Sequence, residues 1–341
     1  MTATFDARTR TARPRPGRVD KDPSQNRTLG MLFVTRRCNI DCSYCHMAHD
    51  GIADTPLPRL LRAIDLLLAC SDTTLFHWFG GEPLLRMDLV KAGVDYIERT
   101  RAPGHKVEHL ITTNGILLHK HLDWLLENGF RLMLSVDGRF ESQRDYRRSL
   151  GNERAIYERI FGTLELLARE GVSYFCNVVV SPENVGRVLD NVAYLKERGV
   201  PRVQLAYELG PLWDQPSQAR YLATLRAAIE TFHGKDFQIQ NSPWSEPVLG
   251  NAFFAIDCNG DMFQGCAVVL ENTLPTFNDT ARLGHIDDID TLSGKQRERL
   301  AQVTHFLRGT RPNASDYVRL RSNMQLGYRV RKLLLELRHN L

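Results

Sequence analysis

Residues 31–45 read Met-Leu-Phe-Val-Thr-Arg-Arg-Cys-Asn-Ile-Asp-Cys-Ser-Tyr-Cys and place three cysteines in a CxxxCxxC spacing directly after an apolar run. The run 31–34 is typical of a buried strand, and Cys38, Cys42 and Cys45 follow on one short loop. Thiolates this close in sequence can face a single point with little loop entropy to lose, which is what a soft metal centre requires. The stretch therefore predicts a strand that leads into a metal-binding loop.

The number of cysteines leaves the kind of metal open at this point. A structural zinc site normally has four protein ligands, so His46 or His49 would have to complete it. A [4Fe–4S] cluster held by three cysteines instead leaves one iron open to a ligand from outside. Three unrelated thiols in a core are the remaining alternative. The spacing directly after a strand favours the cluster, and motifs further along the chain bear on the choice.

Composition limits the class of protein. The 341 residues are 43% hydrophobic, enough for one large core or two modest ones. We find no apolar run near the roughly 20 residues of a membrane span and no apolar signal segment. Seven cysteines without an export signal indicate the reducing cytoplasm. Residues 1–28 are rich in Arg and Pro, which predicts a disordered basic tail, and no basic and aromatic interleaving points to nucleic acid.

Strands and helices alternate about six times after this tail, which predicts parallel strands joined by right-handed helical crossovers. Six units make a partial (β/α)6 barrel of class α/β over residues 29–210, with a C-terminal extension over 211–341. The predicted strands are 31–34, 74–79, 106–113, 131–136, 174–180 and 202–207. The predicted helices between them are 56–70, 89–99, 120–127, 153–170 and 185–198.

Polar motifs follow the predicted strands at their carboxyl ends, the edge at which α/β folds bind ligands. In the motif Gly80-Gly81-Glu82, the two glycines permit a close approach of the backbone to a ligand, and the carboxylate can hold an ammonium group. Hydroxyl and carboxylate groups suit ribose hydroxyls, and an arginine can bind a carboxylate bidentately. The motifs are Gly80-Gly81-Glu82-Pro83, Thr113-Asn114-Gly115, Ser135-Val136-Asp137-Gly138 and the later Arg147-Arg148.

Together these motifs resemble the signature of radical S-adenosylmethionine (SAM) enzymes. The CxxxCxxC loop with Tyr44 before its last cysteine resembles their cluster loop, and Gly80-Gly81-Glu82 resembles their GGE motif. Ser135 with Arg147 downstream resembles the branch that includes anaerobic sulfatase-maturing enzymes and the maturases of ribosomal peptides. Arg148 is a near alternative to Arg147.

The resemblance implies the cofactors, the site and the chemistry. Cys38, Cys42 and Cys45 would hold one [4Fe–4S] cluster, and SAM would occupy its open iron. One electron from a reductant such as flavodoxin or ferredoxin would cleave SAM to a 5′-deoxyadenosyl radical, which takes a hydrogen atom from an unactivated C–H bond. The implied SAM contacts are Tyr44 near the adenine, Gly80, Gly81, Glu82, Thr113, Asn114, Ser135, Asp137 and Arg147.

The C-terminal third predicts a linker over 209–218, a helix over 219–232 and a β-hairpin over 253–263. The hairpin resembles the start of a SPASM or twitch domain, the auxiliary-cluster extension of that branch. Cys258 and Cys266 are too few for a second cluster, so we expect a degenerate hairpin that caps the barrel mouth. A cluster that these two cysteines share with Cys176 or with a substrate is a remote alternative. Residues 315–341 predict a basic amphipathic helix with Tyr328 on its apolar face.

Three functions compete on the sequence alone. The first is hydrogen abstraction from a peptide or protein side chain, as in maturation of a ribosomal peptide natural product. The second is the same chemistry on a small metabolite such as a sugar or nucleoside. The third, remote, is a non-enzymatic zinc module that uses His46. No catalytic residue stands out, and the candidates for substrate contact or proton transfer are His77, Asn177, Tyr207 and Glu208.

Overall fold

The computed structural model describes residues 27–292 except 48, 50, 150 and 252, together with 305, 306, 308, 309 and 314–338. The basic tail expected over residues 1–28 lies outside this part as far as residue 26, and Thr28 already begins the first strand. No helix within the described ranges is both long and apolar enough to cross a bilayer.

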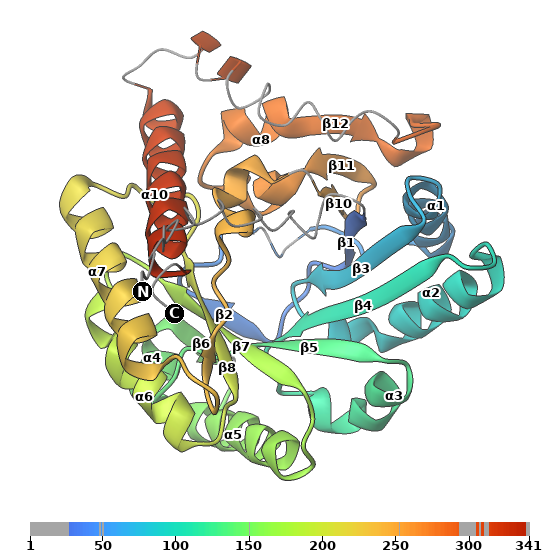
Figure 1. Ribbon diagram of the computed structural model, residues 1–341. Helices are drawn as coiled ribbons and strands as arrows, with labels where there is room; N and C mark the ends of the chain where they lie inside the picture. The colour runs from blue at the N-terminus through green and yellow to red at the C-terminus, as the bar shows by residue number, and fades with distance from the viewer. Residues whose placement is uncertain are drawn as a thin grey trace, which may run out of the picture.

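Six parallel strands form a curved sheet, with the helices that connect them on its outer side, as Figure 1 shows. This arrangement confirms the predicted partial barrel. The strands pair in the order β1 (Thr28–Thr35), β3 (Thr73–Gly80), β4 (Lys106–Thr113), β5 (Phe130–Ser135), β7 (Tyr174–Val180) and β8 (Arg202–Tyr207). The helices are α1 (Leu57–Leu68), α2 (Met87–Thr100), α3 (Leu122–Glu127), α4 (Phe140–Tyr146), α5 (Glu153–Arg169), α6 (Val188–Glu197) and α7 (Gln215–Phe232).

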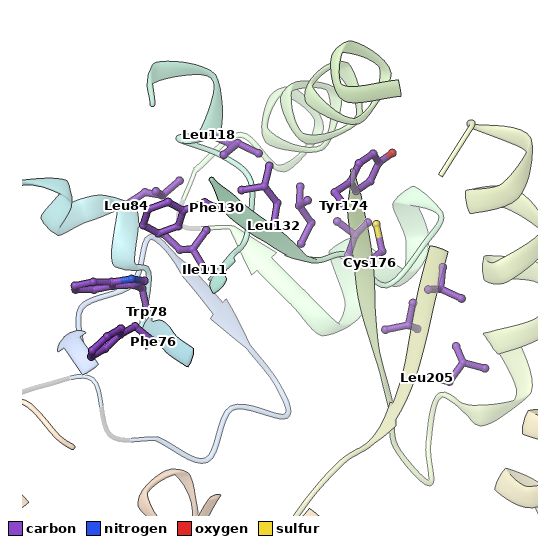
Figure 2. Packing of buried hydrophobic residues seen from close by; sticks show 14 of the residues in the cluster. Phe76, Trp78, Leu84, Ile111, Leu118, Phe130, Leu132, Tyr174, Cys176 and Leu205 are labelled. Carbon is purple, nitrogen blue, oxygen red and sulfur yellow. The ribbon is translucent and has the colours of Figure 1, made fainter. Parts of the chain in front are cut away.

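The main core lies between the strands and these helices. Aromatic and branched side chains such as Trp78, Ile111 and Leu132 fill it, as Figure 2 shows. Cys176 is fully buried among them, which places it in the core as expected for a small apolar side chain. Every second residue of β7 is buried on this side, because successive side chains of a strand point to opposite faces.

Strand β1 is buried on both faces, which explains its unbroken apolar run. Leu32 and Val34 belong to the main core. Met31 and Phe33 point the other way, into a second core formed with the C-terminal part of the chain, including Phe263. The second core packs the C-terminal part against the inner face of β1.

The C-terminal hairpin is part of the sheet. It consists of β10 (Phe254–Ile256) and β11 (Asp261–Gln264), to which β12 (Arg282–His285) adds. Strand β10 pairs in parallel with β1, so the hairpin widens the sheet beside the cysteine loop, whereas we had expected a cap over the barrel mouth. All three residues of β10 are buried, and pairing with β1 provides hydrogen-bond partners for their backbone in the interior.

Two other expectations for the C-terminal third need correction. The segment 209–218 is not all linker, because α7 begins at Gln215 with the Asp214 side chain accepting a hydrogen bond from Ser217 N at 2.8 Å. Helix α10 (Ser315–Arg338) forms as predicted, but Tyr328 is 48% exposed. Leu326 and Val330, one turn apart, are fully buried and shift the apolar face away from the tyrosine.

The shorter elements complete the chain. They are β2 (Ile40–Cys42), β6 (Arg147–Ser149), β9 (Gln238–Ile239), α8 (Pro275–Ala281) and the 3-10 helices η1 (Pro83–Arg86), η2 (Leu118–Lys120), η3 (Val185–Arg187), η4 (Pro243–Ser245), η5 (Val248–Gly250), η6 (Gly265–Leu270) and η7 (Ile286–Asp288).

Candidate active site

A cavity of about 290 Å³ lies at the carboxyl ends of the parallel strands. The cysteine loop forms one wall, the ends of β3, β4, β5, β7 and β8 form the floor, and residues after β8 and in η6 complete it. The lining residues are Cys38, Ile40, Cys42, Tyr44, Cys45, His46, Met47, His49, Phe79, Gly80, Gly81, Thr112, Thr113, Asn114, Met133, Ser135, Arg147, Asn177, Val179, Tyr207, Glu208, Leu209, Val269 and Leu270.

A two-stranded ribbon fixes the cysteine loop. Strand β2 pairs antiparallel with β6, which sets Cys42 opposite Arg147. The amide of Ser43 also donates to the carbonyl of Tyr146 at 2.9 Å. The ribbon selects between the two arginines proposed from the sequence, because Arg147 lines the cavity and Arg148 is exposed.

Arg147, Tyr44 and Asp137 form a linked group at this wall. The Tyr44 hydroxyl donates to Asp137 Oδ2 at 2.6 Å and accepts from Arg147 Nη1 at 2.8 Å. Asp137 is 2% exposed and also accepts from Val179 N at 3.2 Å. Burial raises the pKa of Asp137, although the positive charge of Arg147 acts to lower it. Asp137 therefore does not line the cavity as the sequence suggested but holds Tyr44 from behind.

The glycines of the Gly-Gly-Glu turn serve a contact inside the chain. Gly80 has φ +134°, and a Cβ on Gly80 or Gly81 would collide with the carbonyl oxygen of Thr35 or Arg37. Gly81 N donates to Thr35 O at 2.8 Å. We had expected these glycines to make room for a ligand. Both line the cavity, but what excludes a side chain is the backbone that enters the cysteine loop.

The Glu82 carboxylate differs most from its expected role. It is fully buried and does not line the cavity. It accepts from Thr113 Oγ1 and Asn114 N at 2.8 Å each and from Leu84 N at 3.1 Å. Burial raises its pKa to about 7, although these hydrogen bonds favour the ionised form. The carboxylate is turned toward the end of β4, and its expected contact with the SAM ammonium stays a prediction.

Thr113 and Asn114 are likewise bound to other parts of the fold. The Thr113 hydroxyl donates to Glu82, and Asn114 Nδ2 donates to Asn39 Oδ1 at 2.7 Å and lies 3.9 Å from Cys38 Sγ. Both residues line the cavity, as expected. Their polar groups are engaged with neighbouring residues, and the expected bonds to ribose stay a prediction. Ser135 lines the same floor.

The side of the cavity away from β4 carries three of the four expected substrate-contact candidates, namely Asn177, Tyr207 and Glu208. Glu208 is 9% exposed, burial raises its pKa, and its Oε1 lies 2.8 Å from His46 Nε2. His77 does not line the cavity. Its Nε2 lies 2.7 Å from Thr112 Oγ1, and burial lowers its pKa to about 3, so the ring is neutral.

Sequence reasoning missed the residues that support the site from behind. Glu246, in the segment after η4, accepts from the Tyr207 hydroxyl at 3.0 Å. Arg36, 2% exposed, binds Asp257 through Nε at 2.9 Å and Nη2 at 2.5 Å and also binds Glu271. No local pattern in the sequence announces these pairs, because the partners lie far apart along the chain.

The donor set fits an iron–sulfur cluster. Cys38, Cys42 and Cys45 are free thiols that line one cavity, and burial raises the pKa of Cys38 to about 11, so metal binding has to displace its proton. His46, the fourth ligand of the zinc alternative, is bonded to Glu208. Within the described part of the chain, no three His, Cys, Asp or Glu side chains form a site for a single metal ion.

The other two cysteines of interest lie away from the cavity lining. Cys258 is in the second core, with its thiol 3.4 Å from Phe33 O, and Cys266 is half-buried in η6.

Comparison with known proteins agrees with the motifs. The model of the radical SAM superfamily matches residues 32–190. A probable GTP 3′,8-cyclase of Methanopyrus kandleri is 31% identical over 233 residues, which cover 64% of this chain and 71% of that protein. A serine-type anaerobic sulfatase-maturating enzyme of Bacteroides thetaiotaomicron is 25% identical over 218 residues, 61% of this chain and 52% of its own length, so the chain spans about half of that relative.

Solved structures share the fold. A structure of anSMEcpe with bound AdoMet has a TM-score of 0.69 at 16% identity and covers 92% of this chain and 98% of its own. Streptococcus suis SuiB bound to the precursor peptide SuiA has a TM-score of 0.55 at 13% identity and covers 86% of this chain and 70% of its own. Together with its sequence relatives, the cavity with its three cysteines shows that the chain is an enzyme of the radical SAM superfamily, whose cofactors are a [4Fe–4S] cluster and SAM.

Proposed function

We propose that this enzyme abstracts a hydrogen atom from a side chain of a peptide or protein. When bound, the reduced cluster and SAM supply the 5′-deoxyadenosyl radical that takes the hydrogen atom. The protein's own residues bind the two cofactors, orient the substrate and exclude water. A one-electron reductant of the flavodoxin or ferredoxin type would feed the cluster.

The observation that carries the proposal is the unequal polarity of the cavity walls. The cysteine wall carries Tyr44 and Arg147, which suit the polar SAM molecule. The lining after β8 and in η6 presents the apolar Leu209, Val269 and Leu270 together with the one carboxylate of the lining, Glu208. An amino-acid side chain attached to a peptide backbone, partly apolar and carrying hydrogen-bond donors, complements this side.

The same geometry supports a set of SAM contacts among the lining residues. Arg147 is our candidate for the SAM carboxylate, because Tyr44 holds its guanidinium at the wall beside Cys42. Ser135 at the end of β5 is our candidate for a ribose hydroxyl, and the backbone of Gly80 and Gly81 borders the same space. Asp137 and Glu82 do not line the cavity; they accept hydrogen bonds from the lining residues Tyr44 and Asn114 and hold them in position.

Relatives with known substrates support a peptide. One curated relative is a sulfatase-maturating enzyme. Two structures with the same fold contain peptides, namely anSMEcpe with the Kp18Cys peptide and SuiB with its precursor peptide SuiA.

A small metabolite is the second candidate, because several sequence relatives are GTP 3′,8-cyclases. A nucleoside triphosphate carries several negative charges and is normally bound by several cations. Among the described residues that line the cavity, Arg147 is the one Arg or Lys, and we propose it for the SAM carboxylate, so no second lining Arg or Lys is left for a triphosphate. The charge of the cavity therefore favours the peptide.

The test is hydrogen transfer from a labelled substrate. The protein is reconstituted anaerobically with iron and sulfide, reduced, and mixed with SAM and either a deuterated peptide encoded beside its gene or deuterated GTP. We expect deuterium in 5′-deoxyadenosine with the peptide and none with GTP, read by mass spectrometry. Deuterium from GTP alone would establish the second candidate. Tight zinc without iron uptake would contradict both, and Cys42→Ala is the control that should cleave no SAM.

A further inference from the structure

The Asn114 side chain has a fixed orientation beside the first cysteine of the loop. Its Oδ1 accepts a hydrogen bond from Ile116 N at 3.1 Å, which leaves Nδ2 to face the other way. Nδ2 donates to Asn39 Oδ1 at 2.7 Å and lies 3.9 Å from Cys38 Sγ. Asn114 is only 4% exposed, so little water competes for these contacts. An amide N–H group is thus aimed at the region of a cluster ligand.

Glu82 connects Asn114 rigidly to the cysteine loop. Its carboxylate accepts from Asn114 N at 2.8 Å, while its own amide donates to Arg37 O at 2.9 Å, one residue before Cys38. The same carboxylate holds the Thr113 hydroxyl at 2.8 Å. One fully buried residue therefore sets the distance between the end of β4 and the start of the loop.

Hydrogen bonds to ligand sulfurs are one of the means by which proteins set the reduction potential of an iron–sulfur cluster. Reduction adds negative charge to the cluster and its thiolates. A donor beside a thiolate stabilises the reduced state more than the oxidised state, so it raises the potential, and groups that orient such a donor contribute through it.

We propose that Asn114 donates to the Cys38 sulfur when the cluster is bound and so raises its reduction potential, with Glu82 as the positioning residue for this donor. The inference rests on the proposed function to the extent that Cys38 holds the cluster. It gives the Gly-Gly-Glu glutamate and the Thr-Asn-Gly asparagine a role in electron transfer to SAM, through the reducing power of the cluster and not through a direct bond to SAM.

The test compares midpoint potentials of anaerobically reconstituted proteins, followed by electron paramagnetic resonance during redox titration in the absence of SAM. Asn114→Ala removes the donor, and Asn114→Leu removes it while filling a similar volume. Glu82→Gln keeps the shape of the positioning side chain but weakens its hold on Asn114 N. Thr112→Val is the matched control, because Thr112 lines the same cavity and bonds to His77 instead of to the cysteine loop.

We expect both Asn114 variants to load iron and to shift the midpoint potential to more negative values. Glu82→Gln should shift it in the same direction by a smaller amount, and Thr112→Val should not shift it. An unchanged or more positive potential in an iron-loaded Asn114 variant would overturn the inference. A native chain that takes up no iron would instead overturn the proposed function, so the two failures are distinguishable.

Discussion

His46 Nε2 lies 2.8 Å from Glu208 Oε1, and this contact joins the residue after the last loop cysteine to the residue after the last strand of the arc. The two residues are 162 positions apart in the sequence. Both line the cavity, so the contact links the cysteine wall to the part of the lining that follows β8. A substrate bound on that side would meet a carboxylate whose position is set by the cysteine loop.

We expect Glu208→Gln to uncouple SAM cleavage from substrate modification. Loss of a charge-assisted hydrogen bond of about 1.5–3 kcal/mol should lower product formation roughly 10- to 100-fold. Iron content and 5′-deoxyadenosine formed without substrate should change little, because Glu208 bonds to His46 and not to a cluster cysteine, and the Gln side chain can keep a hydrogen bond to His46. Quantifying both products by mass spectrometry tests this. Glu197→Gln, which changes an exposed carboxylate at the end of α6, is the control. Equal loss of both products would refute a role on the substrate side.

The buried Arg36–Asp257 pair should be essential for stability. Asp257→Ala leaves Glu271 beside Arg36 but removes the fully buried carboxylate that binds its guanidinium twice, so the variant should destabilise the fold by about 3 kcal/mol. Urea unfolding of the apoprotein measures this. An exposed pair gives the comparison, since Arg226 and Glu230 are 43% and 56% exposed and Glu230→Ala should cost at most about 1 kcal/mol. Similar losses in both variants would contradict the assignment.

The pH dependence of stability should carry the signature of Glu246. Burial raises its pKa from 4.5 to about 8, and the facing Tyr207 and Tyr221 also have raised pKa values and stay neutral in this range. The folded state thus keeps a proton that the unfolded state releases. The contribution is complete below pH 4.5 and is lost as pH rises to about 8, at up to about 1.4 kcal/mol per pH unit.

Glu246→Gln cannot ionise and should remove this dependence. Thermal unfolding is expected to show a variant similar to the native chain at pH 5 and more stable at pH 9. The exposed Glu197→Gln should follow the native chain at both values. If the difference in stability between the native chain and Glu246→Gln were the same at pH 9 as at pH 5, the pKa of Glu246 would not be raised in the folded state.

Gly81→Ala should damage the cysteine loop. The new Cβ would collide with the carbonyl oxygens of Arg36 and Arg37, which are backbone atoms held by their own hydrogen bonds. We expect reduced iron uptake on reconstitution, measured by iron analysis. Gly162→Ala in α5 is the matched control, because a Cβ there meets nothing within 4 Å and should stabilise the helix by about 0.5–1 kcal/mol. Full iron loading of Gly81→Ala would show that the loop can move aside.

Much of the fold could be predicted from the sequence because its signals are local. The strands 106–113, 174–180 and 202–207 have the bounds that their apolar pattern predicts. The CxxxCxxC loop and the motifs after the strands meet in one cavity because parallel strands end at one edge of a sheet. Periodicity and chain order are sufficient for these conclusions.

Partners distant in sequence could not be predicted in the same way. A Gly-Gly-Glu turn does not reveal that Glu82 points to Asn114, and an Asp after a strand does not reveal that Asp137 lies behind Tyr44. The parallel pairing of β10 with β1 joins segments more than 200 residues apart, and no pattern within either segment identifies the other as its neighbour.

The sequence by itself determined the family, the strand order of the arc and the three cysteines, because each depends on spacing along the chain. Only the tertiary structure decided which polar groups face the cavity and which are satisfied inside the fold. The physical reason is that a buried carboxylate or amide must find hydrogen-bond partners. In Glu82 and Asn114 those partners are brought together by chain packing, not by sequence spacing.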